Sequence, residues 1–391
     1  MSKISLLGQI IQKLDRSLFN KQVKEHASDK HQKGFDSWSH LVSMLFCHLA
    51  KSQSLRDISN GLRSATGNLN HLGNVHPPTK SNLSYQNKHR DWELFKGYYF
   101  GLLNQLGQQA GFKQVKFRIK SKIFLLDSST ISLCLSLFDW AKYKTKKGAV
   151  KLHTLLDFDG NLPVYVNITD GKTADNKGAY DIPLIERSVI VADRFYNDFS
   201  LLNVWDSNQV FFVVRHKDNI QFKSVKENEL PQNRQPHLLK DEIIELTGVQ
   251  SKKKYPNQLR RVAIWDEKNE QVIEVITNHM TWCANTISEL YKSRWQIEIF
   301  FRDIKQLLHI KSFIGTSQNA VMIQIWTALI TILILKYLKE LAKHNWYLSN
   351  LVAFLRINLF VKIDLQKWLD EPFLKKEKPP NSNAQGVLFD F

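Results

Sequence analysis

Residues 291–305 read YKSRWQIEIFFRDIK, and this stretch constrains the fold around it. On a helix advancing about 100° per residue, four polar positions fall within roughly 60° of one another and form a stripe about 21 Å long. These positions are Tyr291, Arg294, Glu298 and Lys305. The adjacent apolar stripe consists of Ile297, Phe300, Phe301, Ile304, Leu307 and Leu308. The pattern predicts a helix that packs on a core and holds a carboxylate between cations at its edge. The alternative is an ordinary solvated polar face.

Two further carboxylates follow short apolar runs that are typical of buried strands. Asp127 ends the run Ile-Phe-Leu-Leu-Asp, and Asp193 ends the run Val-Ile-Val-Ala-Asp. A charge at such a place is costly unless something offsets it, and ligands of open sheets gather at strand ends. Asp127 could instead cap a turn with the following Ser128, and Asp193 could simply pair with Arg194.

Together with Glu298, these residues give three carboxylates, which are the hard oxygen ligands that Mg²⁺ and Mn²⁺ prefer. Two such ions a few Å apart can activate a water molecule or a 3′-hydroxyl group and stabilise the leaving oxygen of an in-line phosphoryl displacement. The spacing alone does not establish this chemistry. Its combination with a basic chain and the polar stripe favours a metal site beside a phosphate backbone.

The composition favours a polyanionic partner. The 391 residues include 54 Lys and Arg against 37 Asp and Glu, a net charge of +17 with a pI near 9.6. Cys47, Cys134 and Cys283 lack C-x-x-C spacing, which supports neither a zinc site nor a disulfide framework. We expect a cytoplasmic protein without a membrane span, because the longest apolar run, residues 325–335, is too short to cross a bilayer and predicts a buried helix.

Residues 1–115 are predicted to form an all-helical DNA-binding domain that resembles a helix-turn-helix module. An apolar helix pattern covers residues 37–50, a second helix follows the capping Ser54, and a long third helix covers about 79–106. The third helix carries side chains that can reach base edges and phosphates. Among them are Lys80, Asn82 and Arg90. The alternative is a plain helical bundle with a solvated polar face.

From about residue 120 the pattern changes to that of strands, and strands alternating with helices and a hairpin predict an α/β fold with a mixed sheet. The hairpin turn is Asp159-Gly160-Asn161. A second hairpin is predicted from RVAIWD and QVIEVIT. The expected parts are a core at 120–217, a β-rich insertion at 218–285, the second part of the core at 286–345, and a C-terminal helical region with a flexible tail at 346–391.

These residues resemble the motifs of one family. The chain is similar to bacterial cut-and-paste transposases of the insertion-sequence-four family, within the ribonuclease H-like DDE recombinases. The matching residues are the LLDSST block at Asp127, the VADRFYND block at Asp193, and the complete signature of Tyr291, Arg294, Glu298 and Lys305. The resemblance covers residues 120–345 and, more loosely, the helical region before them. Phe195 departs from it, since a small residue commonly follows the Asp-Arg of the second block.

The resemblance implies a ribonuclease H-like catalytic core with two bound Mg²⁺ ions, or Mn²⁺ in their place. The residues that it makes the catalytic and metal-binding triad are Asp127, Asp193 and Glu298. The residues that it makes contacts to DNA phosphates near the transposon 5′ end are Tyr291, Arg294 and Lys305. Cations on one face of a helix can contact successive phosphates of a DNA backbone, which agrees with this assignment.

The resemblance also assigns roles to the insertion and to partners. In this family the insertion protects a hairpin intermediate and stacks on a flipped base, for which Trp265 and Trp282 are the candidates here, although each could belong to the core instead. The implied partners are double-stranded DNA, as element ends and as target, and a second copy of the chain in a homodimeric synaptic complex. The implied location is the bacterial cytoplasm, at the nucleoid.

We therefore expect a transposase that binds the inverted repeats of its element, cleaves them through a hairpin intermediate and joins them to target DNA. A catalytically silent, repurposed DNA-binding protein is the main alternative, and a host nuclease of the same fold is another. The complete set of three carboxylates and four signature residues argues against both.

Overall fold

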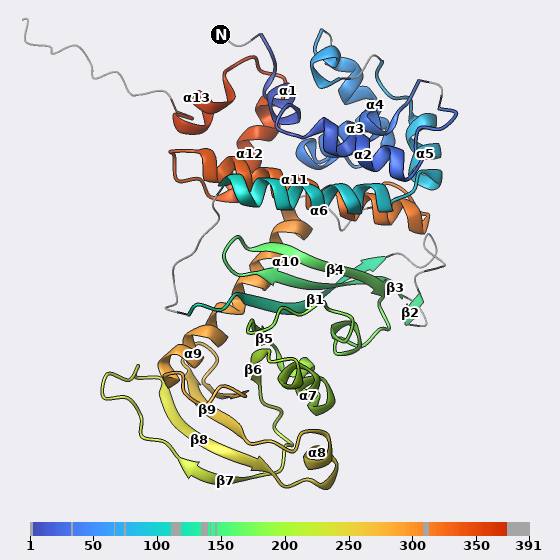
Figure 1. The fold of residues 1–391 in the computed structure, drawn as a ribbon. Helices are drawn as coiled ribbons and strands as arrows, with labels where there is room; N and C mark the ends of the chain where they lie inside the picture. Colours follow the sequence, from blue (N-terminus) through green and yellow to red (C-terminus); the bar gives the residue numbers. More distant parts are fainter. Residues whose placement is uncertain are drawn as a thin grey trace, which may run out of the picture.

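The computed structural model has a layer of helices lying against one large mixed sheet (Figure 1). It describes residues 3–32, 34–65, 67–73, 76–110, 119–133, 140, 142–144, 147–307 and 313–373. The predictions for Cys134, Leu308 and the flexible tail lie outside the described residues. The predicted α/β class with a mixed sheet is confirmed.

The N-terminal and C-terminal helices form one layer, in which α3 and α6 pack against α11 (Figure 1). The N-terminal helices are α1 (Leu6–Ile11), α2 (Arg16–Glu25), α3 (Ser37–Ala50), α4 (Leu55–Ser64), η1 (Leu69–Leu72), α5 (Lys80–His89) and α6 (Glu93–Ala110). The C-terminal helices are α11 (Gln318–Leu341), α12 (Leu348–Asn358) and α13 (Leu365–Asp370). Side chains of Asp36 and Ser54 accept backbone N–H groups at the starts of α3 and α4, so both predicted helices are confirmed.

The predicted long third helix is wrong, because the chain leaves the helix between α5 and α6. Arg90 adopts an extended conformation, with φ −71° and ψ 130°. The end of α5 is capped from α11, where the Asn319 amide donates to the carbonyl oxygens of Asn87 (3.0 Å) and Arg90 (2.7 Å). This contact satisfies carbonyl groups that a helix end leaves without partners.

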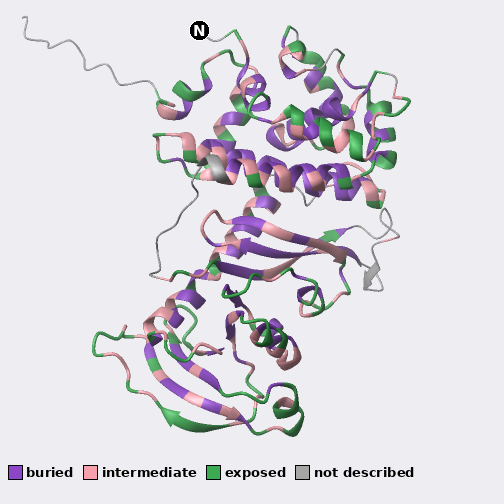
Figure 2. Cartoon of the chain, in the orientation of Figure 1, coloured by how far each residue is buried: buried purple, intermediate pink, exposed green. Residues whose placement is uncertain are grey.

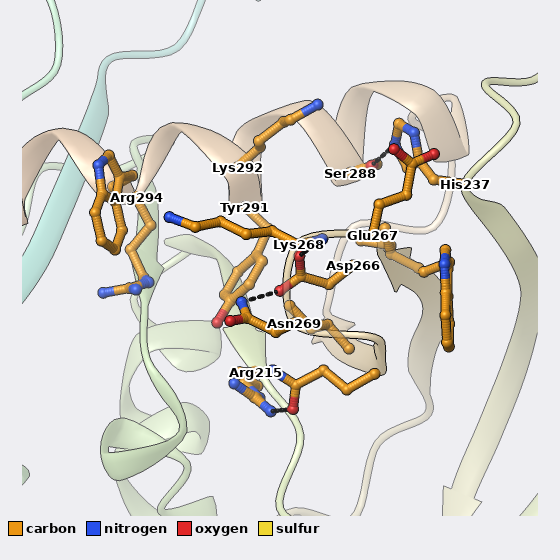
Figure 3. Close-up of a pocket in the computed structure, with 15 residues that line it drawn as sticks. Arg215, His237, Asp266, Glu267, Lys268, Asn269, Ser288, Tyr291, Lys292 and Arg294 are labelled. Carbon is orange, nitrogen blue, oxygen red and sulfur yellow. Dashed lines mark hydrogen bonds between the residues drawn. The ribbon is translucent and has the colours of Figure 1, made fainter.

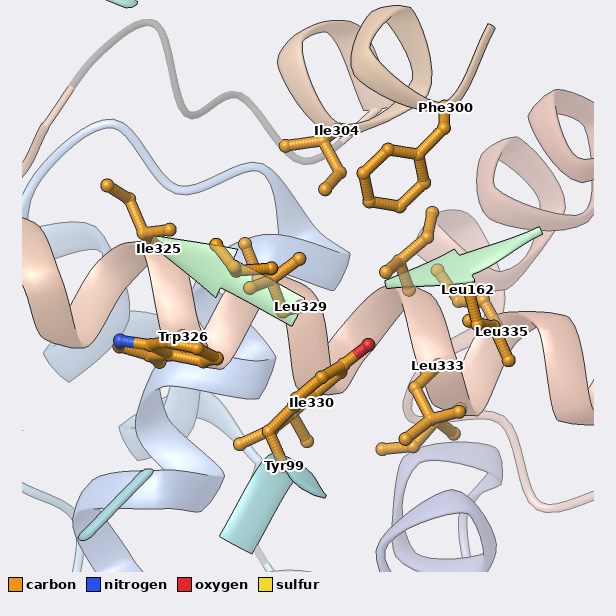
Figure 4. Close-up of a cluster of buried hydrophobic side chains, with 14 of the residues drawn as sticks. Tyr99, Leu162, Phe300, Ile304, Ile325, Trp326, Leu329, Ile330, Leu333 and Leu335 are labelled. Carbon is orange, nitrogen blue, oxygen red and sulfur yellow. The ribbon is translucent and has the colours of Figure 1, made fainter. Parts of the chain in front are cut away.

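Helix α11 is the centre of the main hydrophobic core. Trp326 packs against Tyr99 and Phe100 of α6, and Phe300 and Ile304 approach from α10 (Trp295–Leu307) (Figure 4). Residues 320–335 of α11 are all buried. Figure 2 shows α6, which packs against α11, with few exposed residues. By length and composition α11 is the one helix of the described chain that could cross a membrane, and 89% of its apolar window is buried inside the protein. The prediction of a buried helix is confirmed.

The sheet has ten strands in the order β2-β3-β1-β5-β6-β10-β9-β8-β7, with β4 also on β3. Its strands are β1 (Ile123–Leu133), β2 (Lys142–Lys144), β3 (Lys147–Asp157), β4 (Leu162–Asp170), β5 (Val189–Ala192), β6 (Phe211–Arg215), β7 (Phe222–Glu227), β8 (Leu238–Leu246), β9 (Leu259–Asp266) and β10 (Gln271–Thr277). The connections contain η2 (Lys177–Ala179), η3 (Arg194–Tyr196), α7 (Phe199–Ser207) and α8 (Val249–Lys254). Both predicted hairpins are confirmed, as β3–β4 and β9–β10.

The centre of the sheet brings two of the predicted carboxylates together. Strands β1, β5 and β6 run parallel, and the last pair between β1 and β5 is Leu126 with Ala192. The next residues are Asp127 and Asp193, so the two carboxylates follow neighbouring positions at the end of β5. Asp127 itself lies within β1, which continues to Leu133 beside β3.

The β-rich insertion is not a separate sheet. Strand β10 pairs antiparallel with β6, so β7 to β10 extend the central sheet to its far edge. The exposed edge strand β7 carries Lys223 and Lys226, which discourage pairing with another chain. The main core likewise includes residues from Leu6 to Leu369. Residues from all the parts expected from the sequence therefore lie in the main core, and a second core covers the opposite face of the sheet.

Candidate active site

The signature helix is broken at Arg294, so the prediction of one continuous helix is wrong. Helix α9 (Ala284–Ser293) ends there and α10 begins at the next residue. Two tight i→i−3 hydrogen bonds flank the break, from the N–H of Arg294 to the Tyr291 carbonyl and from the N–H of Ile297 to the Arg294 carbonyl, both 3.1 Å. The apolar side chains of α10 that the structure describes, Ile297, Phe300, Phe301 and Ile304, are buried as predicted.

Arg294 joins a carboxylate of the sheet to a carboxylate of α10. Its Nη1 lies 3.5 Å from Asp127 Oδ2, and its Nη2 donates to Glu298 Oε1 at 2.5 Å. The guanidinium also lies 5.9 Å from the centre of the Tyr291 ring. One cation thus bridges residues that are far apart in the sequence, and the polar stripe faces the strand that carries Asp127.

Asp193 approaches the same place from the end of β5. Its Oδ1 accepts the backbone N–H of Arg194 at 2.7 Å, which starts η3. Its charge acts on Asp127, since it helps to raise the pKa of that carboxyl group. The Arg194 guanidinium lies 5.7 Å from the exposed ring of Phe195. Phe195, the departure from the family pattern, therefore points to the surface and leaves Asp193 at the strand end.

The pKa of Asp127 is raised to about 7, chiefly by burial. Arg294 and the backbone N–H of Ser128 oppose the rise, whereas Asp193 and Glu298 add to it. A buried carboxylate beside two others is a group that a bound cation stabilises. In the present arrangement Arg294 is that cation.

The donor chemistry fits a divalent ion such as Mg²⁺, because all three candidate ligands are carboxylates. Within the described part of the chain, no three Asp, Glu, His or Cys side chains lie close enough together to hold a metal ion. The guanidinium of Arg294 bonds both Asp127 and Glu298 instead. A metal ion held by both carboxylates would therefore require Arg294 to move towards another anion.

Lys305 lies at the other end of the polar stripe. Its Nζ donates to Ser129 Oγ (2.6 Å) and to the Thr130 carbonyl oxygen (2.9 Å) of β1. A cavity of about 340 Å³ opens here, lined by Asp127, Ser128, Ser129, Glu298, Phe301, Arg302, Lys305 and Gln306. The cavity joins the buried carboxylates to solvent beside two cations, which suits a phosphate group.

A larger groove of about 670 Å³ lies between α9 and the β9–β10 hairpin (Figure 3). Arg294 and Tyr291 line it, and Arg294 also bonds Asp127 and Glu298, so the groove lies next to the carboxylate site. Its other cations are Arg215, Lys268 and Lys292. Besides Tyr291, two tryptophan rings line it, Trp265 (38% exposed) and Trp295 (53% exposed). Sequence reasoning missed Trp295, although it directly follows Arg294 in the quoted stretch.

Trp282 has a different environment. Its ring stacks on His279 with centroids 3.7 Å apart and contacts Phe211 at 5.6 Å. Its carbonyl oxygen accepts a hydrogen bond from the buried Arg260. Trp282 does not line the groove. These contacts favour the packing interpretation for Trp282, whereas Trp265 faces the groove.

The residues of the helical region that were predicted to contact DNA differ in their exposure to solvent. Lys80 and Asn82 are exposed on the first turn of α5. Arg90 is only 3% exposed, and its guanidinium donates to the carbonyl oxygens of Asp36 and Phe35, both at 3.1 Å. Arg90 therefore holds the helical layer together and does not face a DNA strand.

Comparison with known families gives two matches. Residues 118–334, more than half of the chain, match the transposase DDE domain. Residues 2–74 match a domain of unknown function, DUF4372. The first match contains all three carboxylates and the four signature residues.

Three relatives carry transposase names. A probable transposase for insertion sequence element IS5377 of Geobacillus stearothermophilus is 29% identical over 61% of this chain and 63% of that protein. The putative transposase y4zB of Sinorhizobium fredii is 30% identical over 57% and 63%. A putative transposase for insertion sequence element IS4SA of Synechocystis sp. is 26% identical over 75% and 82%. The chain thus spans less than two thirds of the first two relatives.

Among solved structures, the piggyBac transposase in its cryo-EM synaptic complex with hairpin DNA is 11% identical, with a TM-score of 0.42 over 94% of this chain and 80% of that chain. This likeness is too weak to carry an argument. The family match and the named relatives are enough to assign the family without it. The chain belongs to the transposase DDE domain family, together with transposases of bacterial insertion sequences.

Proposed function

We propose that the protein is a metal-dependent DNA transposase that cuts the ends of its own element and joins them to target DNA. The observation that carries this proposal is the bridge from Arg294 to both Asp127 and Glu298. It brings the signature helix against the strand of the first carboxylate, which is the arrangement that a metal site beside a phosphate backbone requires.

Asp127, Asp193 and Glu298 would hold two Mg²⁺ ions, or Mn²⁺. Such ions lower the pKa of a bound water or hydroxyl and stabilise the charge on the leaving oxygen. Arg294 would exchange its carboxylate partners for a DNA phosphate when they bind metal. Lys305, fixed by Ser129 and Thr130, would hold a second phosphate at the mouth of the cavity. Tyr291 would contribute a hydrogen bond from the groove side.

The groove supports a role for the insertion in holding a displaced strand. Stacking on aromatic side chains and pairing of phosphates with cations are the two means by which proteins hold single strands. Trp265 and the cations Arg215 and Lys268 offer both beside the carboxylate site. A hairpin intermediate would need such a place for its unpaired bases.

The reaction would proceed as a series of in-line displacements at one ribonuclease H-like centre. Water would nick one strand at each element end, and the freed 3′-hydroxyl would attack the opposite strand to form the hairpin. Opening of the hairpin would regenerate the 3′-hydroxyl for attack on target DNA. The exposed face of α5, with Lys80 and Asn82, would bind the inverted repeats, and two ends would be paired by a homodimer in the bacterial cytoplasm, at the nucleoid.

A cleavage assay tests this proposal. The protein would be mixed with linear DNA carrying the segments that flank its gene, in Mg²⁺ or EDTA, with Asp193→Asn as the matched control. We expect position-specific breaks that need metal and are absent with the variant. Specific binding without breaks would favour the repurposed DNA-binding protein instead. Breaks that persist with Asp193→Asn would contradict the assignment of the triad.

A further inference from the structure

The pairing of strand β1 with its neighbours changes at Asp127, the first of the three candidate metal ligands. Up to Leu126 the strand is paired on both sides, with β5 and with β3. From Asp127 onward it is paired with β3 alone, because β5 ends at Ala192. Residues 127–130 therefore have an edge without backbone pairing, and other contacts must fix their position.

Side chains fix this segment from both faces of the sheet. Since successive side chains of a strand point to opposite faces, Asp127 and Ser129 face α10, where Arg294 and Lys305 hold them. Ser128 points to the opposite face. Its hydroxyl group donates to Asp175 Oδ1 at 2.5 Å. Asp175 thus restrains the residue next to Asp127 from behind.

Asp175 is itself firmly held. Lys151 Nζ, on β3, donates to Asp175 Oδ1 at 2.9 Å and to the Thr173 carbonyl oxygen at 2.8 Å. The side chains of Lys151 and Asp175 are 13% and 22% exposed. The next residue, Asn176, donates to Asp198 Oδ2 at 2.8 Å, at the start of α7. The connection after β4 is therefore anchored to β3, through Lys151, and to the start of α7, through Asp198.

The same group of side chains reaches the second carboxylate. Tyr196, buried in η3 three residues after Asp193, has its pKa raised first by burial and then by Asp127 and Asp175. Its buried hydroxyl group has no hydrogen-bond partner in the described part of the chain, and Ser128 is close enough to lower its pKa. Lys151, Asp175 and Ser128 thus fix the backbone beside Asp127, and Tyr196 lies next to them on the segment that follows Asp193.

We propose that Asp175 is a positioning residue that, through Ser128, fixes Asp127 beside Asp193 so that the two carboxylates can bind a metal ion. This inference rests on the proposed function, since it assumes that both carboxylates are metal ligands. Asp175 does not touch the reacting atoms, because its Oδ1 is engaged by Ser128 and Lys151 on the far face of the strand. It acts through Ser128.

Mn²⁺ binding to the full chain, measured by isothermal titration calorimetry without DNA, tests the inference. Loss of a side chain that orients a metal ligand commonly costs about 10- to 100-fold in affinity. We expect that loss for Asp175→Ala, and also for Ser128→Ala, which removes only one hydroxyl group. Asp175→Asn keeps an acceptor oxygen for Ser128 and should recover most of the affinity. Asp127→Asn should abolish binding.

Asp181→Ala is the matched control, because Asp181 is an exposed carboxylate of the same connection between β4 and β5. It should bind Mn²⁺ like the parent protein, and thermal unfolding should show every variant folded. The double variant Ser128→Ala/Asp175→Ala should lose no more than Asp175→Ala alone, since that variant has already broken the contact with Ser128.

The outcomes separate the two proposals. If Asp127→Asn loses binding but Ser128→Ala and Asp175→Ala bind as the parent does, the positioning role is wrong and the metal site stands. If Asp127→Asn binds Mn²⁺ as the parent does, the triad assignment fails and the positioning role fails with it.

Discussion

Two arginines were expected to contact DNA, and the structure gives them opposite surroundings. Arg90, after α5, donates to backbone carbonyl oxygens in the interior of the helical layer. Arg294, between α9 and α10, bonds two carboxylates that line the cavity beside Lys305. Backbone carbonyl groups cannot take another partner there without unfolding, whereas a carboxylate can exchange an arginine for a metal ion. The partners of an arginine, more than its burial, decide whether it can be released for a ligand.

Glu298→Gln tests the Arg294 side of this comparison most severely. Glutamine keeps an acceptor for Arg294 but is a poor metal ligand, so cleavage should fall at least about 100-fold, or about 2.7 kcal/mol of barrier. Binding to the element ends should be nearly unchanged in a gel-shift measurement. Loss of binding together with cleavage would contradict the separation of these roles.

Arg90→Ala and Arg294→Ala form a matched pair for stability. Removal of Arg90 leaves buried carbonyl groups and Asp29 without their donor, which should lower the unfolding free energy by about 3–5 kcal/mol. Removal of Arg294 should cost about 1 kcal/mol, because Asp127 can take up a proton or a cation instead. Urea unfolding measures both values, and equal losses would remove the distinction between the two arginines.

The pH dependence of stability tests whether Asp127, a partner of Arg294, has a raised pKa in the folded protein. Asp127 has a pKa of about 7 in the folded protein, against about 3.9 in an unfolded chain. Between these values the folded state binds more protons, so this group makes the metal-free protein less stable as pH rises from about 4 to about 7. Relative to the parent, Asp127→Asn should gain stability by up to about 1.4 kcal/mol per pH unit in this window. Unfolding in EDTA measures the difference, and parallel curves would contradict the raised pKa.

Lys305→Ala should have the smallest effect of the four. If Lys305 contacts one phosphate, the slope of log binding constant against log salt concentration should fall in magnitude by about 0.9. Lys80→Ala offers the comparison on α5, where the same change should appear without loss of cleavage at saturating protein. An unchanged slope would remove Lys305 from the DNA track.

Local chemistry explains what the sequence could predict. Capping residues such as Asp36 and Ser54, the Asp159-Gly160-Asn161 turn and the apolar stripe of α10 act over a few residues, and each gave the correct element. The three candidate carboxylates were proposed because each follows an apolar run or stands in a polar stripe, and their role stays a prediction.

The errors all come from contacts distant in sequence. The break before α6 depends on Asn319 of α11, which caps the end of α5. The break at Arg294 accompanies its bridge to Asp127 on another element. The sequence also leaves open how the β-rich insertion joins the core, because the pairing of β10 with β6 is encoded by no local pattern. Asp175 could not be identified as a partner of Ser128 for the same reason.

Helix α11 has a consequence for how the protein is made. The ribosome synthesises α3 and α6 long before α11, the helix on which both pack. At about 5–20 residues per second, more than 200 residues and roughly 10–40 s separate them. During that interval the early helices expose apolar surface that chaperones recognise. A chain truncated before α11 would therefore not persist as a folded DNA-binding fragment that competes with the full-length protein for element ends.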